Sequence, residues 1–356
     1  MTDVPMQPPA GPAGPAGPAM PAAPAGSAAP AAPVAPAPAA PALPAPLTRV
    51  PWGSVALFVV IAMGLAWLVM LPLWLTLGPN PNPESVSMGE QLLAQLLPTA
   101  MMFTPAIAML VVVFLMRTPR SARARFLGLW PLRPAKRVVW FMVLANFGPI
   151  VFVGLAMLIA TAFGWFTPDI AGHSGFAESL AAAGVTPDSV GVVFGVQLVV
   201  IAIAGLLNLL PAFGEEIGWR GWLLPALRPL GTWPALLLSG AIWGIWHTPV
   251  TLLGHNFGLY DWRGVALMTV GCMFLGVLFG WLRLRSGSVW PAVIAHGAFN
   301  GAVALYGMLA MAGAPMPMPL ANPLGVSGWI AAAIVIVILL ATRQFGKEPA
   351  LAPPRR

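Results

Sequence analysis

From Trp52 onward, apolar stretches of about 20 residues follow one another, each long enough to cross about 30 Å of hydrocarbon. Hydrophobic residues make up 58% of the chain and charged residues only 8%, whereas a soluble domain carries roughly 25% charged residues. So few charges could not cover the surface of a water-soluble fold. Strands that span a bilayer are short and alternate in polarity, so these stretches can only be helices. The sequence therefore predicts an all-α, polytopic transmembrane bundle.

We expect eight transmembrane helices, at residues 53–77, 91–116, 138–163, 190–212, 233–253, 264–284, 288–310 and 326–342. They form a transmembrane domain at 49–346. Residues 1–48 are almost entirely Ala, Pro and Gly, and proline removes backbone donors, so we predict a disordered tail there. Residues 347–356 form a short basic tail.

The distribution of Lys and Arg predicts the orientation of the bundle. Residues 117–137, between the second and third expected helices, contain many basic side chains, which mark a cytoplasmic segment. Alternating from there puts both termini in the cytoplasm and leaves only Arg263 among the basic residues outside. We expect an integral, multi-pass protein of the cytoplasmic membrane of a bacterium, in contact with membrane lipid. The net charge of +7 does not indicate nucleic-acid binding, because the basic residues flank apolar runs and form no separate basic domain.

Ionisable groups are costly at membrane depth and are candidates for function. The first such segment is EEIGWR at 215–220, directly after the expected helix at 190–212. On a helix, Glu216 and Arg220 share a face and are placed for an ion pair, while Glu215 points about 100° away. A buried carboxylate left free of that pair suits a general base. A charge cluster that caps a helix end explains the segment equally well.

The second segment is WGIWH at 243–247, within the helix expected at 233–253. Trp243 and His247 share a helical face, so the indole could pack beside the imidazole and fix its orientation. A single histidine in an apolar helix is more often a hydrogen-bonded core residue than a catalyst. No other polar side chain of that helix is an obvious partner, which favours a functional role for His247.

The third segment is HGAFN at 296–300, near the start of the helix expected at 288–310. His296 and Asn300 lie four residues apart on one face and need polar partners within the bundle. They could simply join helices by hydrogen bonds. They could also be donors for a developing oxyanion.

Together, these segments resemble the three motifs of the CPBP family, which are Glu-Glu-x-x-x-Arg, aromatic-x-x-x-His and His-x-x-x-Asn. The family includes CAAX-type prenyl endopeptidases and bacteriocin-processing or self-immunity intramembrane proteases. The resemblance covers about residues 190–310. One departure is Trp243, where the family usually has Phe.

The resemblance implies an intramembrane endopeptidase with its active site in a membrane cavity. Glu215 and His247 would activate water, His296 and Asn300 would stabilise the oxyanion, and Glu216 and Arg220 would be structural. The substrate would be a peptide or protein reached from the membrane, of which a prenylated C-terminal peptide is one option.

A divalent metal such as zinc is a candidate cofactor. Glu215, His247 and His296 could form a His₂Glu zinc site with an open position for water. The chain lacks the His-Glu-x-x-His helix of soluble zinc peptidases, so the spacing does not decide between metal-assisted and direct glutamate catalysis. For the two histidines outside the motifs, His173 and His255, we expect no catalytic role, since polar loop residues usually face water.

Two other functions fit part of the sequence. In an ion-coupled transporter, buried Glu and His would relay protons, but the chain shows no clear internal repeat and no paired broken helices. A non-catalytic membrane scaffold or immunity protein would keep the fold, and loss of a motif residue would have favoured it. All motif residues are present.

Overall fold

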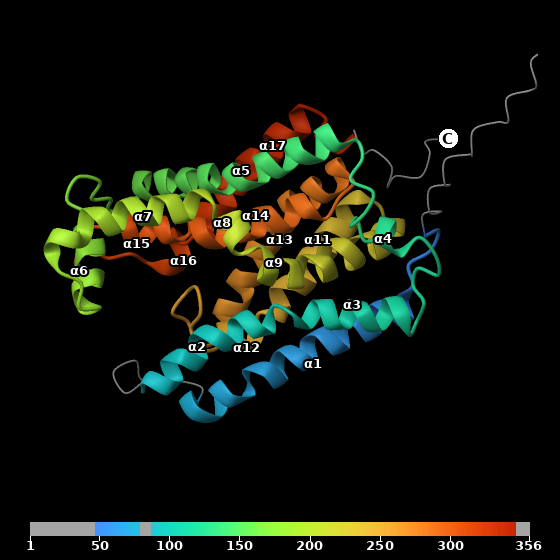
Figure 1. Cartoon of the computed structure of the whole chain (residues 1–356), viewed down its shortest axis with the longest axis horizontal. Helices are drawn as coiled ribbons and strands as arrows, with labels where there is room; N and C mark the ends of the chain where they lie inside the picture. The colour runs from blue at the N-terminus through green and yellow to red at the C-terminus, as the bar shows by residue number, and fades with distance from the viewer. Residues whose placement is uncertain (1–46, 79–86, 347–356) are drawn as a thin grey trace, which may run out of the picture. The chain divides into compact units, whose positions relative to one another are not determined.

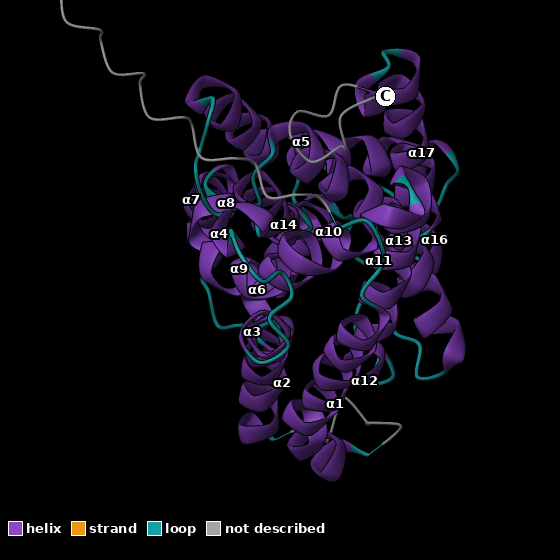
Figure 2. Ribbon diagram, turned by 90° about the vertical axis from the view of Figure 1, so that its right-hand side faces the viewer, coloured by secondary structure: helices purple, strands orange, loops and turns teal. Residues whose placement is uncertain are grey.

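The computed structural model describes residues 47–78 and 87–346, so the tails predicted at 1–48 and 347–356 lie almost wholly outside the described residues. The described residues are helical with no β-strand, which confirms the all-α prediction (Figure 2). The α-helices are α1 (Trp52–Leu77), α2 (Met88–Met101), α3 (Thr104–Phe114), α4 (Arg123–Phe126), α5 (Ala135–Ala162), α6 (Ser174–Ala182), α7 (Val190–Ala202), α8 (Ala204–Leu207), α9 (Leu209–Glu216), α10 (Leu224–Leu227), α11 (Thr232–Trp246), α12 (Thr248–Thr251), α13 (Trp262–Ser286), α14 (Trp290–Ala302), α15 (Ala304–Leu309), α16 (Met318–Ala321) and α17 (Val326–Ala341). A π-helix at Ile217–Leu223 joins α9 to α10.

Among the described residues, six helical stretches are long and apolar enough to cross a membrane. They are Trp52–Leu77, Met88–Phe114, Ala135–Ala162, Trp262–Ser286, Trp290–Leu309 and Met318–Ala341. The predicted number of eight is therefore not confirmed. The two other predicted spans, 190–212 and 233–253, are present as chains of shorter helices.

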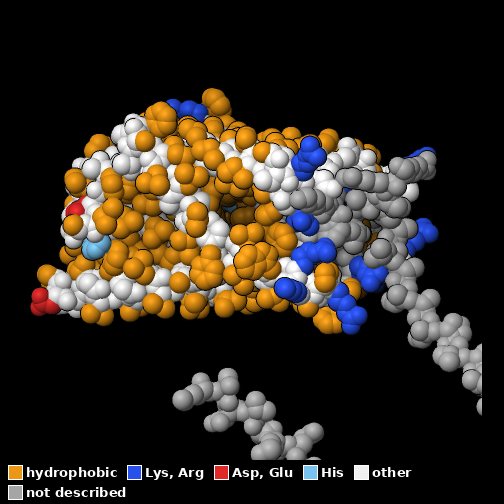
Figure 3. Space-filling model, turned by 90° about the horizontal axis from the view of Figure 1, so that it is seen from above, with side chains coloured by type: hydrophobic (Ala, Val, Ile, Leu, Met, Phe, Trp, Pro, Cys, Tyr) orange, Lys and Arg blue, Asp and Glu red, His pale blue; other side chains and the backbone are white. Residues whose placement is uncertain are grey.

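The surface of the described bundle is suited to lipid. Large apolar side chains such as Val60, Val151, Leu158 and Val192 are about two-thirds exposed. The space-filling view shows hydrophobic side chains over most of one face (Figure 3). Such a surface is stable only against hydrocarbon, so the protein is an integral membrane protein.

The helices that carry the three motifs lie inside the bundle. α5 and α17 lie on one side, α1 to α3 on the opposite side, and α9, α11, α13 and α14 between them (Figures 1 and 2). α11 packs along α13 and α14 packs along α5. The crossing of α11 and α13 is close, because a side chain at Gly244 would collide with the backbone of Thr269.

The segment after the predicted span 190–212 stays buried in the bundle. α9 continues to Glu216, and the π-helix and α10 that follow are fully buried. The predicted span stops at residue 212, whereas the helical path continues through the charged residues. Those charges lie inside the protein, at a depth where they can meet α11 and α14.

Candidate active site

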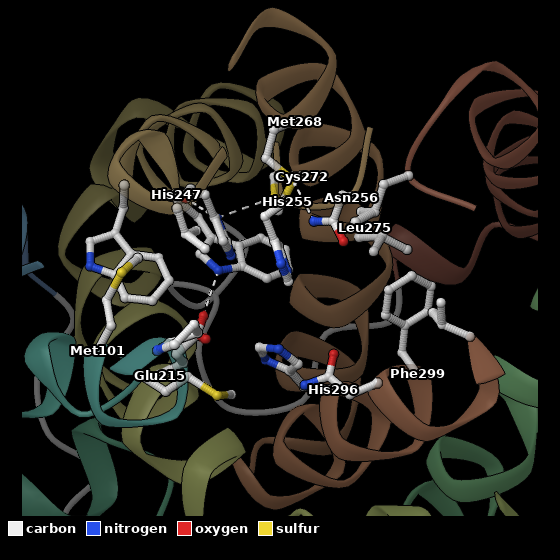
Figure 4. Close-up of a pocket in the computed structure, with 18 of the residues that line it drawn as sticks. Met101, Glu215, His247, His255, Asn256, Met268, Cys272, Leu275, His296 and Phe299 are labelled. Atoms are coloured by element: carbon white, nitrogen blue, oxygen red, sulfur yellow. Dashed lines mark hydrogen bonds between the residues drawn. The ribbon is translucent and has the colours of Figure 1, made fainter. Parts of the chain in front are cut away.

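The three motif segments face one cavity of about 350 Å³. Its walls include Glu215 from α9, Trp243 and His247 from α11 and its C-terminal end, and His296 and Asn300 from α14. In Figure 4, Glu215, His247 and His296 are arranged around the cavity and point toward it. Residues 85 positions apart in the sequence therefore share one site.

Glu216 and Arg220 form the predicted ion pair. An Nη1 hydrogen of Arg220 is donated to Oε1 of Glu216 over 2.6 Å, and both side chains are almost completely buried. The same oxygen accepts a hydrogen bond from Nδ1 of His296 at 3.0 Å. Arg220 of the π-helix and His296 of α14 both donate to this one oxygen, so Glu216 links the π-helix to α14. This contact fixes the ring of His296.

Glu215 points away from that pair, as the helical geometry predicts. Its side chain is 2% exposed, and its Oε2 accepts a hydrogen bond from the indole N–H of Trp243 at 2.7 Å. The helix that carries it lies directly against the α2–α3 junction, because a side chain at Gly214 would collide with Met102 and Phe103. Glu215 is therefore held at the wall of the cavity next to α2.

His247 lies where helix α11 ends. Pro249 has no N–H and disfavours continuation of the helix, and the N–H of His247 bonds to Gly244 instead of Trp243. The carbonyl of Trp243 is then free to accept a hydrogen bond from Nδ1 of His247 at 2.9 Å. A carbonyl can only accept, so Nδ1 carries the hydrogen and Nε2 keeps its lone pair. The break in α11 thus supplies the partner that the sequence analysis could not find.

His296 and Asn300 line the cavity from successive turns of α14. His296 is 5% exposed, and Nδ1 is the nitrogen bonded to Glu216. Asn300 is exposed, and among the described residues its side chain has no hydrogen-bond partner. A carboxamide without a protein partner on a cavity wall is available to a ligand.

Two residues near the site were missed by the sequence analysis. The first is Arg283 of α13, which is fully buried. Its Nε donates to the carbonyl of Arg220 at 3.0 Å and its Nη2 to the carbonyl of Phe126 at 2.8 Å. From the sequence alone, Arg283 counted only as one of the basic residues expected on the cytoplasmic side. In fact it connects α13, the π-helix and the segment after α4.

The second is His255, for which the sequence predicted a position facing water and no catalytic role. It lies in the turn between α12 and α13, is exposed, and lines the same cavity (Figure 4). Gly254 and Asn256 on either side of it have positive φ angles of 90° and 69°. The backbone of Asn256 is held by a 2.9 Å hydrogen bond from Asn322 to its carbonyl. This turn brings the imidazole back toward the cavity, and no periodic pattern in the sequence indicates it.

The side chains as placed do not form a metal site. Among the residues that the structure describes, no three His, Cys, Asp or Glu side chains are grouped to hold one ion. Glu215, His247 and His296 therefore do not form the His₂Glu set in this arrangement, and a zinc ion stays a prediction.

The arrangement combines groups that a hydrolytic site needs. A carboxylate and an imidazole with a free nitrogen can take protons from water. An imidazole and a carboxamide on the facing helix can donate hydrogen bonds to an oxygen that becomes negative.

Comparison with known proteins agrees with the motifs. Residues 196–302 match the family model described as type II CAAX prenyl endopeptidase, Rce1-like. A curated protein named CAAX prenyl protease 2, from Methanococcus maripaludis, is 29% identical over 101 residues. The match covers 26% of this chain and 37% of the relative, so it spans little more than a third of the relative's length. The resemblance predicted from the sequence is thereby confirmed, in that residues 196–302 are similar to the type II CAAX prenyl endopeptidase, Rce1-like family.

Proposed function

We propose that this protein is an intramembrane endopeptidase that hydrolyses a peptide bond of a membrane-associated substrate. The observation that carries the proposal is the shared cavity, because Glu215, His247, His296 and Asn300 all line it. The family match over residues 196–302 includes all four residues and supports the same activity.

In the proposed reaction, Glu215 and His247 together bind a water molecule and take its proton as its oxygen attacks the carbonyl carbon of the peptide. The carbonyl oxygen becomes negative, and hydrogen bonds from Asn300 and from Nε2 of His296 stabilise it. Because Nδ1–H of His296 is used on Glu216, this step requires His296 to be protonated on both nitrogens. The C–N bond then breaks, and the proton passes to the leaving amine. The products are a carboxylic acid and an amine, which ionise to a carboxylate and an ammonium group, so atoms and charges balance.

Glu216 and Arg220 have a structural role in this proposal. Their ion pair lies behind His296, away from the water, and fixes the orientation of the imidazole. The proposed steps use only the chain's own groups. A divalent metal such as zinc is a separate candidate, which metal analysis of the purified protein and assays with and without a chelator would test.

The proposed substrate is a peptide or protein that reaches the cavity from the membrane. Apolar side chains, including Met101, Met268, Leu275 and Phe299, line the cavity beside the polar groups. They would accept apolar side chains next to the cleaved bond. The name of the archaeal relative refers to a CAAX prenyl protease, and a prenylated C-terminal peptide is one substrate of this class.

We further propose that the protein lies in the cytoplasmic membrane of a bacterium with both termini inside. On the face shown in Figure 3, most Lys and Arg side chains gather at one end of the bundle, and the acidic side chains at the other. The basic end would face the cytoplasm.

The test compares new protein termini in membranes of cells that produce wild-type protein or Glu215→Ala at equal levels. Termini that are present with the wild type and absent with Glu215→Ala would support proteolysis and identify the substrate. The control is Glu178→Ala, which removes an exposed carboxylate on α6, outside the cavity. Matching profiles for wild type and Glu215→Ala would reject the proposal and favour the transporter or scaffold function.

A further inference from the structure

Trp243 makes a hydrogen bond that the usual residue of its motif could not make. The family that this chain resembles usually has Phe at this position, and Phe has no side-chain donor. Here the indole Nε1–H donates to Oε2 of Glu215 over 2.7 Å, and Trp243 is only 3% exposed. A bond to a buried carboxylate is stronger than a bond between neutral groups.

The orientation of the indole is fixed from several sides. The guanidinium carbon of Arg220 lies 4.2 Å from the centre of the ring, which is a cation–π contact. The ring of His296 meets it edge-on with 5.5 Å between centres, and Phe279 packs at 6.0 Å. These neighbours hold the ring so that the indole N–H of Trp243 points toward Glu215.

The hydrogen bond distinguishes the two oxygens of Glu215. Oε2 is taken by the indole, whereas Oε1 has no hydrogen-bond partner among the described residues. Oε1 is also absent from the fully buried polar atoms that lack a partner, so it is accessible at the cavity wall. One oxygen is therefore anchored and the other is available to water.

The backbone of Trp243 orients a second group of the site. Its carbonyl accepts the hydrogen bond from Nδ1 of His247 at 2.9 Å, which leaves Nε2 of that ring unprotonated. A single residue thus contacts the carboxylate through its side chain and the imidazole through its main chain. Substitution of the side chain would remove the first contact and keep the second.

We propose that Trp243 is a positioning residue for the general base, in that its indole N–H holds Glu215 with one carboxylate oxygen toward the attacking water. The inference rests on the proposed endopeptidase activity. Without the donor, the carboxylate rotates about its side-chain bonds, and fewer molecules have it aligned at any moment. The chemical step slows, while the surfaces that bind the peptide are unchanged.

The test measures kcat and KM of purified protein in lipid nanodiscs. The probe is an internally quenched peptide spanning the cleavage site found by comparing termini between wild type and Glu215→Ala. Trp243→Phe should lower kcat about 10- to 100-fold and leave KM within about threefold, as for loss of a hydrogen bond to a charged group.

The matched control is Trp222→Phe. Trp222 is also fully buried, and its indole N–H donates to the carbonyl of Thr118 at 2.8 Å, away from the cavity. The same substitution there removes an equal donor without touching Glu215, so kcat should stay within about twofold of the wild type. Equal losses of kcat in the two variants would overturn the inference, since they would reflect general loosening of the fold.

A second variant covers the case in which Trp243→Phe does not fold. Benzothienylalanine at position 243 keeps the size and aromatic surface of the indole and replaces the N–H by sulfur. The same fall in kcat is expected, and a kcat equal to that of the wild type would overturn the inference while leaving the endopeptidase activity in place. If Glu215→Gln cleaves the peptide as fast as the wild type, the proposed function fails, and the role of Trp243 fails with it.

Discussion

Glu215 and Glu216 are neighbours in the chain and lie in different surroundings. Glu216 belongs to a paired cluster, made of Glu216, Arg220 and Arg283, whose members bond to protein groups and have exposed fractions of 0 to 1%. Glu215 belongs to a cavity group, made of Glu215, His247 and Asn300, whose members line the cavity. His296 joins the two, with one nitrogen on Glu216 and its ring on the cavity wall.

The contrast between the paired cluster and the cavity group shows that a membrane protein can keep ionisable groups inside its helical bundle for two purposes. A buried charge is stable only when it is paired, so the paired cluster holds the fold together and has little freedom to react. A reactive group must keep an atom without a protein partner at the cavity, as in the cavity group, whereas Oε2 of Glu216 has no partner but is buried away from the cavity. Substitutions should therefore separate into those that lower stability and those that lower activity.

The largest effect on activity is expected at His247. His247→Ala should lower the rate of peptide cleavage by about 100- to 10,000-fold, because it removes a group proposed to take a proton from water. The thermal unfolding temperature should stay close to that of the wild type. The control is His173→Ala, since His173 stacks on Phe194 and lies outside the cavity. Wild-type activity in His247→Ala would show that His247 takes no part in the reaction.

The largest effect on stability is expected in the paired cluster. Arg220→Met leaves Glu216 without its arginine and should destabilise the fold by about 3 to 5 kcal/mol. The double variant Arg220→Met with Glu216→Leu should recover part of that loss, because no unpaired charge is left. Thermal unfolding in detergent measures both. A double variant less stable than Arg220→Met would contradict the pairing argument.

A smaller loss of stability is expected at Arg283. Arg283→Met removes the donors to the carbonyls of Arg220 and Phe126, which should cost about 2 kcal/mol of unfolding free energy. Arg285→Met, two residues on and partly exposed, is the comparison and should cost less. Equal changes in unfolding temperature would show that the buried guanidinium is not a specific link.

The smallest effect is expected at His255. In the cavity, its imidazole can contact the substrate without taking part in the chemistry. His255→Leu should raise KM about fivefold with kcat unchanged, which corresponds to loss of one neutral hydrogen bond. His255→Gln should restore part of the affinity. A fall in kcat would instead place His255 among the reacting groups.

The sequence predicted the helices well where an apolar run is continuous. It was less accurate at the spans 190–212 and 233–253, next to Glu215 and His247, because local features interrupt these helices. The π-helix at Ile217–Leu223 continues the buried path beyond the charges, and Pro249 ends α11 at His247. Hydropathy alone cannot distinguish a charge at the membrane surface from a charge buried among helices.

Within the site, contacts along one helix could be predicted and contacts between helices could not. The Glu216–Arg220 pair and the Trp243–His247 packing follow from the helical repeat. The bonds from Trp243 to Glu215 and from His296 to Glu216 depend on how α9, α11 and α14 cross. The position of His255 depends on a turn with two positive φ angles.

The most direct test of the account makes the same change at the two adjacent glutamates. Glu215→Gln and Glu216→Gln are purified, and thermal unfolding temperature and peptide cleavage are measured for each. We predict that Glu215→Gln keeps the unfolding temperature of the wild type and loses cleavage, whereas Glu216→Gln unfolds at a clearly lower temperature. Retained cleavage by Glu215→Gln, or equal unfolding temperatures for the two variants, would contradict the division between cavity group and paired cluster.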